Sequence, residues 1–580
     1  MKHLLVYMKG YRREAVLAPL FKLLEATLEL LVPLVISSLI DQGIGNRDTG
    51  YVLRMCGTLI ALGIVGLLFS VTAQYYSAKA ATNFIKKVKY ALFEHIQKLS
   101  YSEIDQHGAS TMITRMTSDM NQVQTGVNLT LRLLLRSPFV VFGAMIMAFT
   151  IDKKMALIFA VMIPVLCVIV FAIMLAGIPM YRKVQKKLDD LLFITKENLE
   201  GVRVIRAFCK EDGERKRFRS QNHSLTESQL YAGRISALMN PLTYIVVNAA
   251  VIVLLYTGAL RIQGGLLTQG AVVALYNYLS QILVELLKMA SLVITITKSI
   301  ASGNRIYEML SDGGNEENQQ NMAEKVEKSS GEDDDFIRLD HVSMSYAGAG
   351  DESLTDISFS VKKGETVGII GGTGSGKSTL VNLLPCFYKA DRGSVTIDGV
   401  DVQDYRVEEL RERFGVVPQR AVLFKGTIRS NLAWGKADAT DEEMMEALEL
   451  AQISDYVSQE DIGLNHRVEQ EGKNFSGGQR QRLTIARAFI RRPEILILDD
   501  SASALDFATD ARLRKAIREM DYHPTTFIVS QRTSSIQFAD KIIVLDDGRA
   551  VGIGTHEELL KTCEIYREIY ASQFKEEKAS

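Results

Sequence analysis

Long apolar runs alternate with charged stretches along the N-terminal half of the chain. A helix that crosses a bilayer needs about 20 consecutive, mostly apolar residues. Six runs are long enough, and they lie near Ala15–Ile40, Val52–Tyr75, Leu131–Thr150, Met155–Ile178, Pro241–Ile262 and Val272–Ile296. This pattern predicts an α-helical membrane domain with six spans.

The connections between these spans alternate in length. Two of them, 76–130 and 179–240, are long, helical in pattern and rich in lysine and arginine. Positive charge near the end of a span favours the cytoplasmic side of a membrane. The long connections and the N-terminus are therefore predicted to be cytoplasmic. Six spans return the chain to the same side, so the C-terminus is predicted to be cytoplasmic as well.

Several ionisable residues interrupt the apolar runs. Lys22, Glu25 and Glu29 lie in the first span, and Glu285 and Lys288 lie in the sixth. Charge at membrane depth is costly and usually faces a bundle interior or a water-filled cavity. One interpretation is a substrate cavity in which Glu25, Glu29 and Glu285 attract cations. The alternative is local pairing on each helix, because Lys22 and Glu25 are three residues apart, and Glu285 and Lys288 have the same spacing.

The C-terminal half has a different pattern. Residues 311–335 are polar, acidic and almost free of large apolar groups, so they are predicted to form a linker. Short apolar or alternating runs then indicate strands at Phe336–Tyr346, Asp356–Val361, Glu365–Ile370, Val395–Gly399, Phe414–Gln419, Ile495–Leu498 and Thr526–Ser530. A chain of 580 residues is too long for one core. We therefore expect a transmembrane domain (1–310), the linker and a soluble α/β domain (336–580).

Composition adds few constraints. The formal net charge of −1 argues against a general nucleic-acid-binding protein. The five cysteines (Cys56, Cys167, Cys209, Cys386 and Cys563) show no CxxC motif and no close pairing, so they are predicted to be reduced packing residues. The N-terminus has basic residues but no typical cleavage site, so a removed signal peptide is not expected.

A phosphate-binding motif follows the strand that ends at Ile370. Residues 371–379 read GGTGSGKST and precede a helical pattern, so glycines can let backbone N–H groups surround phosphate oxygens at a helix N-terminus. Lys377 would neutralise the β- and γ-phosphates, and Ser378 would ligate Mg²⁺. The motif predicts an ATP-type site built from Gly371, Gly372, Thr373, Gly374, Ser375, Gly376, Lys377, Ser378 and Thr379.

Further motifs extend this chemistry. The stretch 474–479 reads NFSGGQ and opens a helical pattern, so its serine and glycines form a second anion site at a helix N-terminus. The apolar strand 495–498 runs into Asp499 and Asp500, and carboxylates there can hold Mg²⁺ opposite Ser378. A glutamine, Gln419, also follows an apolar run, and SALD occupies 503–506.

In this order the motifs resemble those of an ABC transporter, and the resemblance covers the whole chain. Six spans with two long cytoplasmic loops, followed by one α/β P-loop ATPase domain of ABC type, are similar to a half-transporter of the exporter type. The resemblance implies Tyr346 as the adenine-stacking aromatic, 371–379 as Walker A, and Ser378, Gln419 and Asp499 around Mg²⁺. It also implies Ser476, Gly477, Gly478 and Gln479 as the signature motif and Asp506 as the D-loop aspartate.

The same resemblance implies partners. Two nucleotide domains would dimerise head to tail, so that each ATP lies between one chain's Walker motifs and the other chain's signature. Coupling helices, expected near Tyr101–His107 and Phe208–Glu214, would dock the long loops onto the nucleotide domain. The chain is therefore expected in the cell membrane, in the lipid bilayer, paired with a second homologous half-transporter and using ATP and Mg²⁺.

Two positions depart from the family's pattern in ways that affect chemistry, while Phe475 replaces the usual leucine of the signature. The catalytic base is normally a glutamate after the Walker B aspartate, and here Asp500 is shorter by one methylene, about 1.5 Å. The switch residue is normally histidine, and here Gln531 can hydrogen-bond a phosphate but cannot carry positive charge. We therefore expect the site to bind ATP but not to hydrolyse it. This combination resembles the degenerate subunit of a heterodimeric bacterial multidrug exporter.

Other interpretations stay open at this stage. One is a homodimeric exporter or lipid flippase that hydrolyses ATP slowly, and another is a membrane protein gated by ATP binding alone. Amphipathic drugs are the expected cargo, because no peptidase domain precedes the spans. Lipids and peptides are the alternatives.

Overall fold

The computed structural model describes residues 3–313, 335–459 and 462–574. The chain forms two compact units, one comprising 1–94 and 110–312 and the other comprising 95–109 and 313–580. The second unit is thus assembled from two separate parts of the chain. The predicted linker, 311–335, falls largely on residues outside the described ranges.

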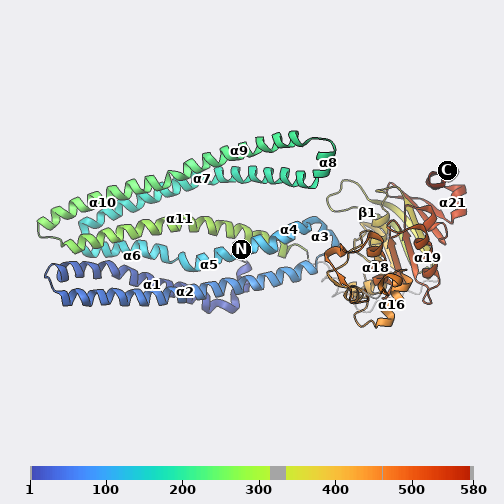
Figure 1. The fold of residues 1–580 in the computed structure, drawn as a ribbon, viewed down its shortest axis with the longest axis horizontal. Coiled ribbons are helices and arrows are strands. Elements are labelled where there is room, and N and C mark those ends of the chain that lie inside the picture. Colours follow the sequence, from blue (N-terminus) through green and yellow to red (C-terminus); the bar gives the residue numbers. More distant parts are fainter. Residues whose placement is uncertain (1–2, 314–334, 460–461, 575–580) are drawn as a thin grey trace. The chain divides into compact units, whose positions relative to one another are not determined.

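Helices account for all the regular structure described in the first unit (Figure 1). They are η1 (His3–Tyr11), α1 (Arg12–Ser38), η2 (Leu39–Ile44), α2 (Thr49–Gln97), α4 (Ala109–Thr114), η3 (Arg115–Asp119), α5 (Met120–Leu133), α6 (Arg136–Ile151), α7 (Lys153–Glu200), α8 (Val202–Ala207), α9 (Glu211–Ala237), α10 (Met239–Gln263) and α11 (Gln269–Ser311). Here η1 is a 3₁₀ helix, and η2 and η3 are π-helical turns that continue α1 and α4.

The six predicted spans are confirmed in the described residues. Six helical stretches are long and apolar enough to cross a membrane, and they contain 42 to 53 residues each. They are longer than the apolar runs because the helices continue into polar sequence beyond bilayer depth. The second half of α7 packs along α9 in this way, as two neighbouring rods in Figure 1.

The core of the membrane unit lies where α1, α6, α7, α10 and α11 meet. Small side chains let these helices approach closely, and they include Ala26, Ala144, Ala148 and Ala156. Tyr278 is fully buried among them, and its hydroxyl donates a hydrogen bond of 2.6 Å to the carbonyl of Leu30. The partner of this polar group is therefore a backbone oxygen of another helix, which pins α11 to α1.

The second unit contains a six-stranded and a four-stranded sheet, with a short β-ribbon. The larger sheet has the order β12-β11-β3-β10-β9-β6, with β11, β3, β10, β9 and β6 parallel and β12 antiparallel at one edge. The smaller sheet, β2-β1-β4-β5, is antiparallel. The strands are β1 (Ile337–Met344), β2 (Leu354–Val361), β3 (Thr366–Gly371), β4 (Arg392–Ile397), β5 (Val400–Asp401), β6 (Phe414–Val417), β7 (Gly426–Thr427), β8 (Arg467–Val468), β9 (Ile495–Asp499), β10 (Thr525–Val529), β11 (Lys541–Asp546) and β12 (Arg549–Gly554).

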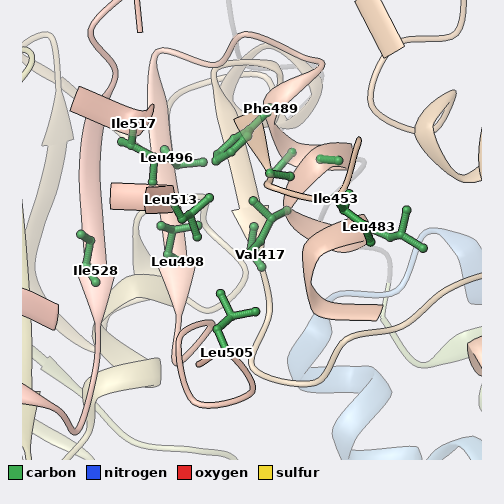
Figure 2. Packing of buried hydrophobic residues seen from close by; sticks show 14 of the residues in the cluster. Val417, Ile453, Leu483, Phe489, Leu496, Leu498, Leu505, Leu513, Ile517 and Ile528 are labelled. Carbon is green, nitrogen blue, oxygen red and sulfur yellow. The ribbon is translucent and has the colours of Figure 1, made fainter. Parts of the chain in front are cut away.

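The second unit also contains helices, most of which lie between its strands in the chain. They are α3 (Tyr101–His107), α13 (Lys377–Leu383), α14 (Val407–Glu412), α15 (Ile428–Leu432), α16 (Asp441–Leu450), α17 (Ser454–Val457), η4 (Gln470–Gly472), α18 (Gly477–Phe489), α19 (Phe507–Arg518), α20 (Thr533–Ile536), α21 (His556–Thr562) and α22 (Glu564–Phe574). Alternate side chains of one strand enter different cores, because successive residues of a strand face opposite sides. On β9, Ile495 and Ile497 join one cluster, whereas Leu496 and Leu498 join the other. Figure 2 shows Leu496 and Leu498 with the side chains that α18 and α19 contribute to the latter cluster.

Helix α3 occupies the residues predicted for the first coupling helix, Tyr101–His107. Ser100 caps its N-terminus, since the side chains of Ser100 and Glu103 each accept a hydrogen bond from the other residue's backbone N–H. Within the second unit, the Tyr101 ring stacks on Phe387 with 4.4 Å between centroids. The Tyr388 hydroxyl donates to Asp105 at 2.5 Å. These contacts make α3 an integral part of that unit.

The position expected for the second coupling helix is wrong. The short helix of this loop is α8, Val202–Ala207, rather than Phe208–Glu214. Gly201 ends α7, and Cys209 takes a left-handed backbone conformation with φ of 51°, which stops α8 before Lys210. Glu211 and Glu214 instead belong to the acidic first turn of α9, where negative charge stabilises a helix N-terminus.

Candidate nucleotide-binding site

The phosphate loop connects β3 to α13, as the sequence predicts. Gly374 and Gly376 have φ of 85° and 90°, a backbone region that side chains with a Cβ rarely adopt. A Cβ at Gly376 would also meet the carbonyl of Ser353 and the side chain of Leu354. The loop therefore needs glycine at this position to reach the N-terminus of α13, where free N–H groups are available to an anion.

Lys377 lies folded back onto this loop. Its ammonium group donates to the carbonyls of Gly371 and Gly372 at 3.0 and 2.5 Å, and to the hydroxyl of Ser375 at 3.3 Å. Burial lowers the pKa of Lys377, and the nearby Asp500 and Asp499 partly oppose that shift. A desolvated cation held by neutral oxygens is well placed to exchange them for charged phosphate oxygens.

The order of the larger sheet brings three strand ends together. β10 lies between β3 and β9, all three are parallel, and ligands of such sheets bind outside the carboxyl ends of the strands. The phosphate loop follows β3. Asp499 is the last residue of β9 and Asp500 follows it, and Gln531 is the second residue after β10. Residues that are far apart in sequence thus converge on one edge.

Ser378 and Asp499 are the pair that fits a magnesium ion. The Ser378 hydroxyl donates to the Asp499 carboxylate at 3.0 Å. Burial raises the pKa of Asp499, and the hydrogen bond from Ser378 opposes this. A buried carboxylate next to a hydroxyl is an oxygen-donor set that Mg²⁺ takes together with phosphate oxygens and water. Gln419 is exposed, and its side chain lowers the pKa of Asp500.

Asp500 takes a strained backbone conformation directly after β9. Its φ is 45°, and its N–H donates to the carbonyl of Val529 on β10 at 3.0 Å. Burial raises the pKa of Asp500, and Gln419, Lys377 and Arg532 act in the opposite direction. The carboxylate therefore interacts with two cations.

Tyr346 lies close to the phosphate helix. Its hydroxyl is 3.0 Å from the hydroxyl of Thr379, and its ring meets Tyr388 edge to face at 5.1 Å. Burial, with the hydrogen bond to Asp105 as a second cause, raises the pKa of Tyr388 well above its usual range. An aromatic ring at the edge of the phosphate loop is the feature that adenine stacking requires.

The signature motif begins helix α18. Ser476 caps this helix, because its side chain accepts from the N–H of Gln479 while the Gln479 side chain accepts from the N–H of Ser476. Gly477 and Gly478 are adjacent to the cap, and Gly477 is exposed with nothing within 4 Å of an added Cβ. Phe475 is buried in a core cluster, so the departure from leucine is accommodated as apolar packing. The helix N-terminus is open to an anion from outside this unit.

The D-loop leads into α19. Asp506 caps this helix, and its carboxylate accepts from the N–H and the hydroxyl of Thr509 at 2.8 Å each. The backbone hydrogen bond from Thr509 lowers the pKa of Asp506. A cavity of about 430 Å³ extends between the Gln419 segment and the start of α18, and Ala504 lines it as well. The segments that carry Gln419, the signature motif and the D-loop therefore line one cavity.

The ionisable residues of the spans form ion pairs. Lys22 contacts Glu25 at 2.5 Å and Lys288 contacts Glu285 at 2.9 Å, which are the two pairs expected from spacing alone. Arg136 of α6 bridges the other helices, with 2.6 Å to Glu29 of α1 and 2.5 Å to Glu285 of α11. The formal charges of these three carboxylates and three cations cancel. Glu29 remains the more accessible partner of Arg136, with 41% of its side chain exposed against 4% for Glu285.

Two residues that make these contacts, Arg136 and Gln573, were not identified from the sequence. Arg136 lies within the third apolar run, and an arginine in such a run is itself a signal of a buried ion pair. Gln573 near the C-terminus hydrogen-bonds the segment that carries Gln531. No local pattern marks that glutamine, because its partners are about forty residues away.

Residues 16–286 match the family model described as ABC transporter transmembrane region, and residues 354–503 match the model described as ABC transporter. The chain belongs to the ABC transporter family, and its membrane helices and ATPase domain together are those of an exporter. It is a multi-pass membrane protein.

Particular relatives support this placement. The chain is 37% identical to "Uncharacterized ABC transporter ATP-binding protein YfiB" of Bacillus subtilis (strain 168), over 99% of each chain. It is 27% identical to "ATP-dependent lipid A-core flippase" of Vibrio vulnificus (strain CMCP6), over 99% of this chain and 98% of the relative. A solved structure, "Structure of a bacterial Atm1-family ABC exporter with ATP bound", shares the fold with a TM-score of 0.78 and 23% identity, over 97% of this chain and 98% of that one.

A lysine substitution tests the phosphate loop. We expect Lys377→Ala to weaken ATP binding at this chain's own site by about 10- to 100-fold, because hydrogen bonds to charged groups contribute about 1.5–3 kcal/mol. Photolabelling of the chain with an azido-ATP, competed by ATP, measures this affinity. Lys515→Ala, an exposed lysine of α19, is the matched control. Unchanged affinity for Lys377→Ala would contradict the assignment of the loop.

Proposed function

We propose that this chain is one half of a heterodimeric ABC exporter, in which its own Walker site binds ATP–Mg²⁺ but hydrolyses it weakly. Its intact signature motif completes the active site of a second, homologous chain. The domains are a transmembrane domain (1–310), a linker (311–335) and an ABC nucleotide-binding domain (336–580). Both termini lie in the cytoplasm, and the cargo is amphipathic.

The observation that carries this proposal is the residue pair at the two strand ends. Asp500 stands after β9 where the family's base is a glutamate, and Gln531 stands after β10 where the family has a histidine. A general base must reach the water that it activates. The Asp500 carboxylate is one methylene shorter than a glutamate, and it interacts with Lys377 and Arg532, so its length and its neighbours work against that reach.

The mechanism uses the residues in the following way. Tyr346 stacks on the adenine, the N–H groups of 372–379 and Lys377 hold the phosphates, and Ser378, Asp499 and Gln419 would hold Mg²⁺, which neutralises phosphate charge when bound. Gly477, Gly478 and the start of α18 face the ATP of the partner subunit. ATP binding closes the dimer and turns the cavity outward, and hydrolysis, mainly at the partner's site, resets it.

Co-purification from the native membrane tests the proposal directly. A second ABC half-transporter with a glutamate and a histidine at the corresponding positions should be isolated with this chain in equal amounts. A homodimer with brisk ATPase activity would overturn the proposal. A homodimer with slow activity would support the flippase-type alternative. Passive flux driven by ATP binding alone would indicate a gated channel.

The proposed cargo rests on the name of one relative and on the acidic residues of the spans. A relative named for lipid A-core supports a cargo with a large apolar part. Glu25, Glu29 and Glu285 are the candidate acidic groups of the cavity, and the exposed edge of Glu29 is the one most open to a cation. A cation would approach a carboxylate that already has a guanidinium partner, so its attraction is weaker than that of a free carboxylate.

A double substitution tests the acidic cavity. We expect Glu25→Gln/Glu29→Gln to lower uptake of a permanently cationic dye into inside-out vesicles by about three- to tenfold, since two unit charges about 4 Å apart attract each other by about 1 kcal/mol at a dielectric constant near 80. Uptake of a neutral amphipathic dye should change less. Glu200→Gln, on an exposed cytoplasmic stretch, is the control. If both dyes are transported as before while expression holds, the carboxylates are only structural.

A further inference from the structure

The last helix of the described chain contacts the segment that follows β10. Gln573, in the last turn of α22, uses both ends of its amide. Its oxygen accepts from the N–H of Thr533 at 2.9 Å and from the hydroxyl of Thr533 at 2.8 Å. Its nitrogen donates to the backbone carbonyl of Gln531 at 2.7 Å. One side chain therefore fixes the backbone on both sides of Arg532.

The same segment is held from two other directions. The N–H of Ser530 donates to the carbonyl of Ile369 on β3 at 3.1 Å, which extends the sheet by one residue. Arg532 lies 4.8 Å from the centroid of the Phe507 ring and donates to the carbonyl of Leu505 at 3.4 Å. Residues 530–533 are thus fixed by the sheet, by the start of α19 and by α22. We call them the switch segment.

The switch segment carries Gln531 to the strand ends at which the phosphate loop and Asp499 converge. The Gln531 side chain is exposed, whereas its backbone carbonyl is the group that Gln573 binds. The orientation of a side chain depends on the backbone that carries it. A contact that fixes the Gln531 backbone therefore limits where the Gln531 amide can reach.

We propose that Gln573 is a positioning residue that sets the switch segment so that Gln531 reaches the γ-phosphate, and that the C-terminal helix thereby responds to the nucleotide bound in this chain. The inference rests on the assignment of the phosphate loop as the ATP site and does not require a particular partner. Thr533 is the first residue of α20, so the hydrogen bonds to Thr533 hold the start of that helix. The hydrogen bond to the Gln531 carbonyl is the one that positions Gln531 relative to the phosphate.

The proposal makes a distinction between two nucleotides. ADP lacks the γ-phosphate, so the position of Gln531 should not affect ADP affinity. Loss of the Gln573 contact should therefore weaken binding of an ATP analogue and leave ADP binding as it was. A single hydrogen bond contributes about 0.5–1.5 kcal/mol, which corresponds to about two- to twelvefold in affinity. Linkage requires the reverse effect as well, so an ATP analogue should protect the amides of α22 and ADP should not.

The experiment is competition against azido-ATP labelling of this chain in the purified full complex, on ice, with ADP or a non-hydrolysable ATP analogue. Gln573→Ala removes all three hydrogen bonds. Gln573→Glu keeps acceptors for Thr533 and loses the donor to Gln531. Both variants should lose about two- to twelvefold of the preference for the ATP analogue over ADP, by the argument above. Ser572→Ala should behave as wild type, because the Ser572 hydroxyl bonds only the carbonyl of Ile569 in its own helix among the described contacts.

A double-mutant cycle tests whether Gln573 acts through Gln531. In a Gln531→Ala background, Gln573→Glu should have no further effect on the preference for the ATP analogue. Equal losses for both nucleotides, or an unchanged preference in Gln573→Glu, would overturn the proposal and leave α22 with a structural role only. The labelling is read on this chain's own band, so it remains interpretable if the second chain proves to be another copy. Failure of azido-ATP to label the chain at all would instead contradict the proposed ATP site.

Discussion

In the proposed heterodimer, Asp500→Asn should leave most of the ATP turnover of the purified complex intact, whereas changing the Walker B glutamate of the second chain to glutamine should lower it by about 10²–10⁴-fold. Both substitutions remove a carboxylate and keep nearly the same shape. The difference is expected because a general base contributes only where it can reach water. Asp500 is short and interacts with Lys377 and Arg532, so little activation is lost with its charge.

The signature motif of this chain supplies the contrasting result. Gly477→Glu should lower turnover by about 10²-fold or more, because it places a carboxylate where α18 presents N–H groups to the partner's ATP. The site has room for the side chain, so the loss would come from charge and position rather than from misfolding. Gly233→Glu, in α9 with nothing within 4 Å of an added Cβ, is the matched control. If Asp500→Asn abolishes turnover as fully as the partner's glutamate change, this chain's own site is catalytic.

Arg136→Met should destabilise the membrane unit by about 3–5 kcal/mol, since removing one member of a buried ion pair leaves uncompensated charge. One guanidinium links α6 to Glu29 of α1 and to Glu285 of α11, and Ser137 donates a further hydrogen bond to Glu285 at 2.8 Å. Without it, Glu29 faces solvent only in part, and Glu285 has Lys288 as its remaining cation among the contacts described. Helices α1, α6 and α11 would lose the guanidinium group that links them.

Thermal challenge of the detergent-solubilised protein, followed by size-exclusion chromatography, measures this effect as a lower midpoint of aggregation. Arg136→Met/Glu285→Gln should recover part of the loss, because the second change removes one of the two carboxylates left behind. Arg54→Met, on an exposed position of α2, is the control for the loss of a positive charge. A midpoint for Arg136→Met equal to that of the control would show that the network adds nothing to stability.

The sequence predicts those parts of the protein that depend on local patterns. The six spans follow from apolar run length, and the strand before the phosphate loop follows from its hydrophobic residues, with β3 at Thr366–Gly371 against a predicted 365–370. Helix α3 follows from position in the loop and occupies the predicted residues. The second short helix was misplaced because a cysteine, Cys209, takes the left-handed conformation that is expected mainly of glycine.

Local sequence patterns do not predict contacts between residues that are far apart in the chain. Arg136 and Glu285 are separated by 149 positions, and nothing in either neighbourhood specifies the other. The hydrogen bonds of Gln573 depend on where α22 ends after folding, which no periodicity reveals. The hydrogen bond from Ser378 to Asp499 likewise requires the ends of two separate strands to meet. Sequence motifs identified the candidate residues at this edge of the sheet, and tertiary packing determines which of them are in contact.

Helix α3 has a consequence for how the protein is made. Its Asp105 bonds Tyr388, a residue 283 positions later, so this part of the nucleotide unit leaves the ribosome long before its binding surface exists. The flanking helices α2 and α4 belong to the membrane unit and can be inserted while α3 has no surface to bind. Tyr101 and the surface formed by Phe387, Tyr388 and Arg411 become mutually covered only after synthesis has passed Arg411. The nucleotide unit therefore closes around α3 only at a late step of biogenesis, once residues 387–411 have been synthesised.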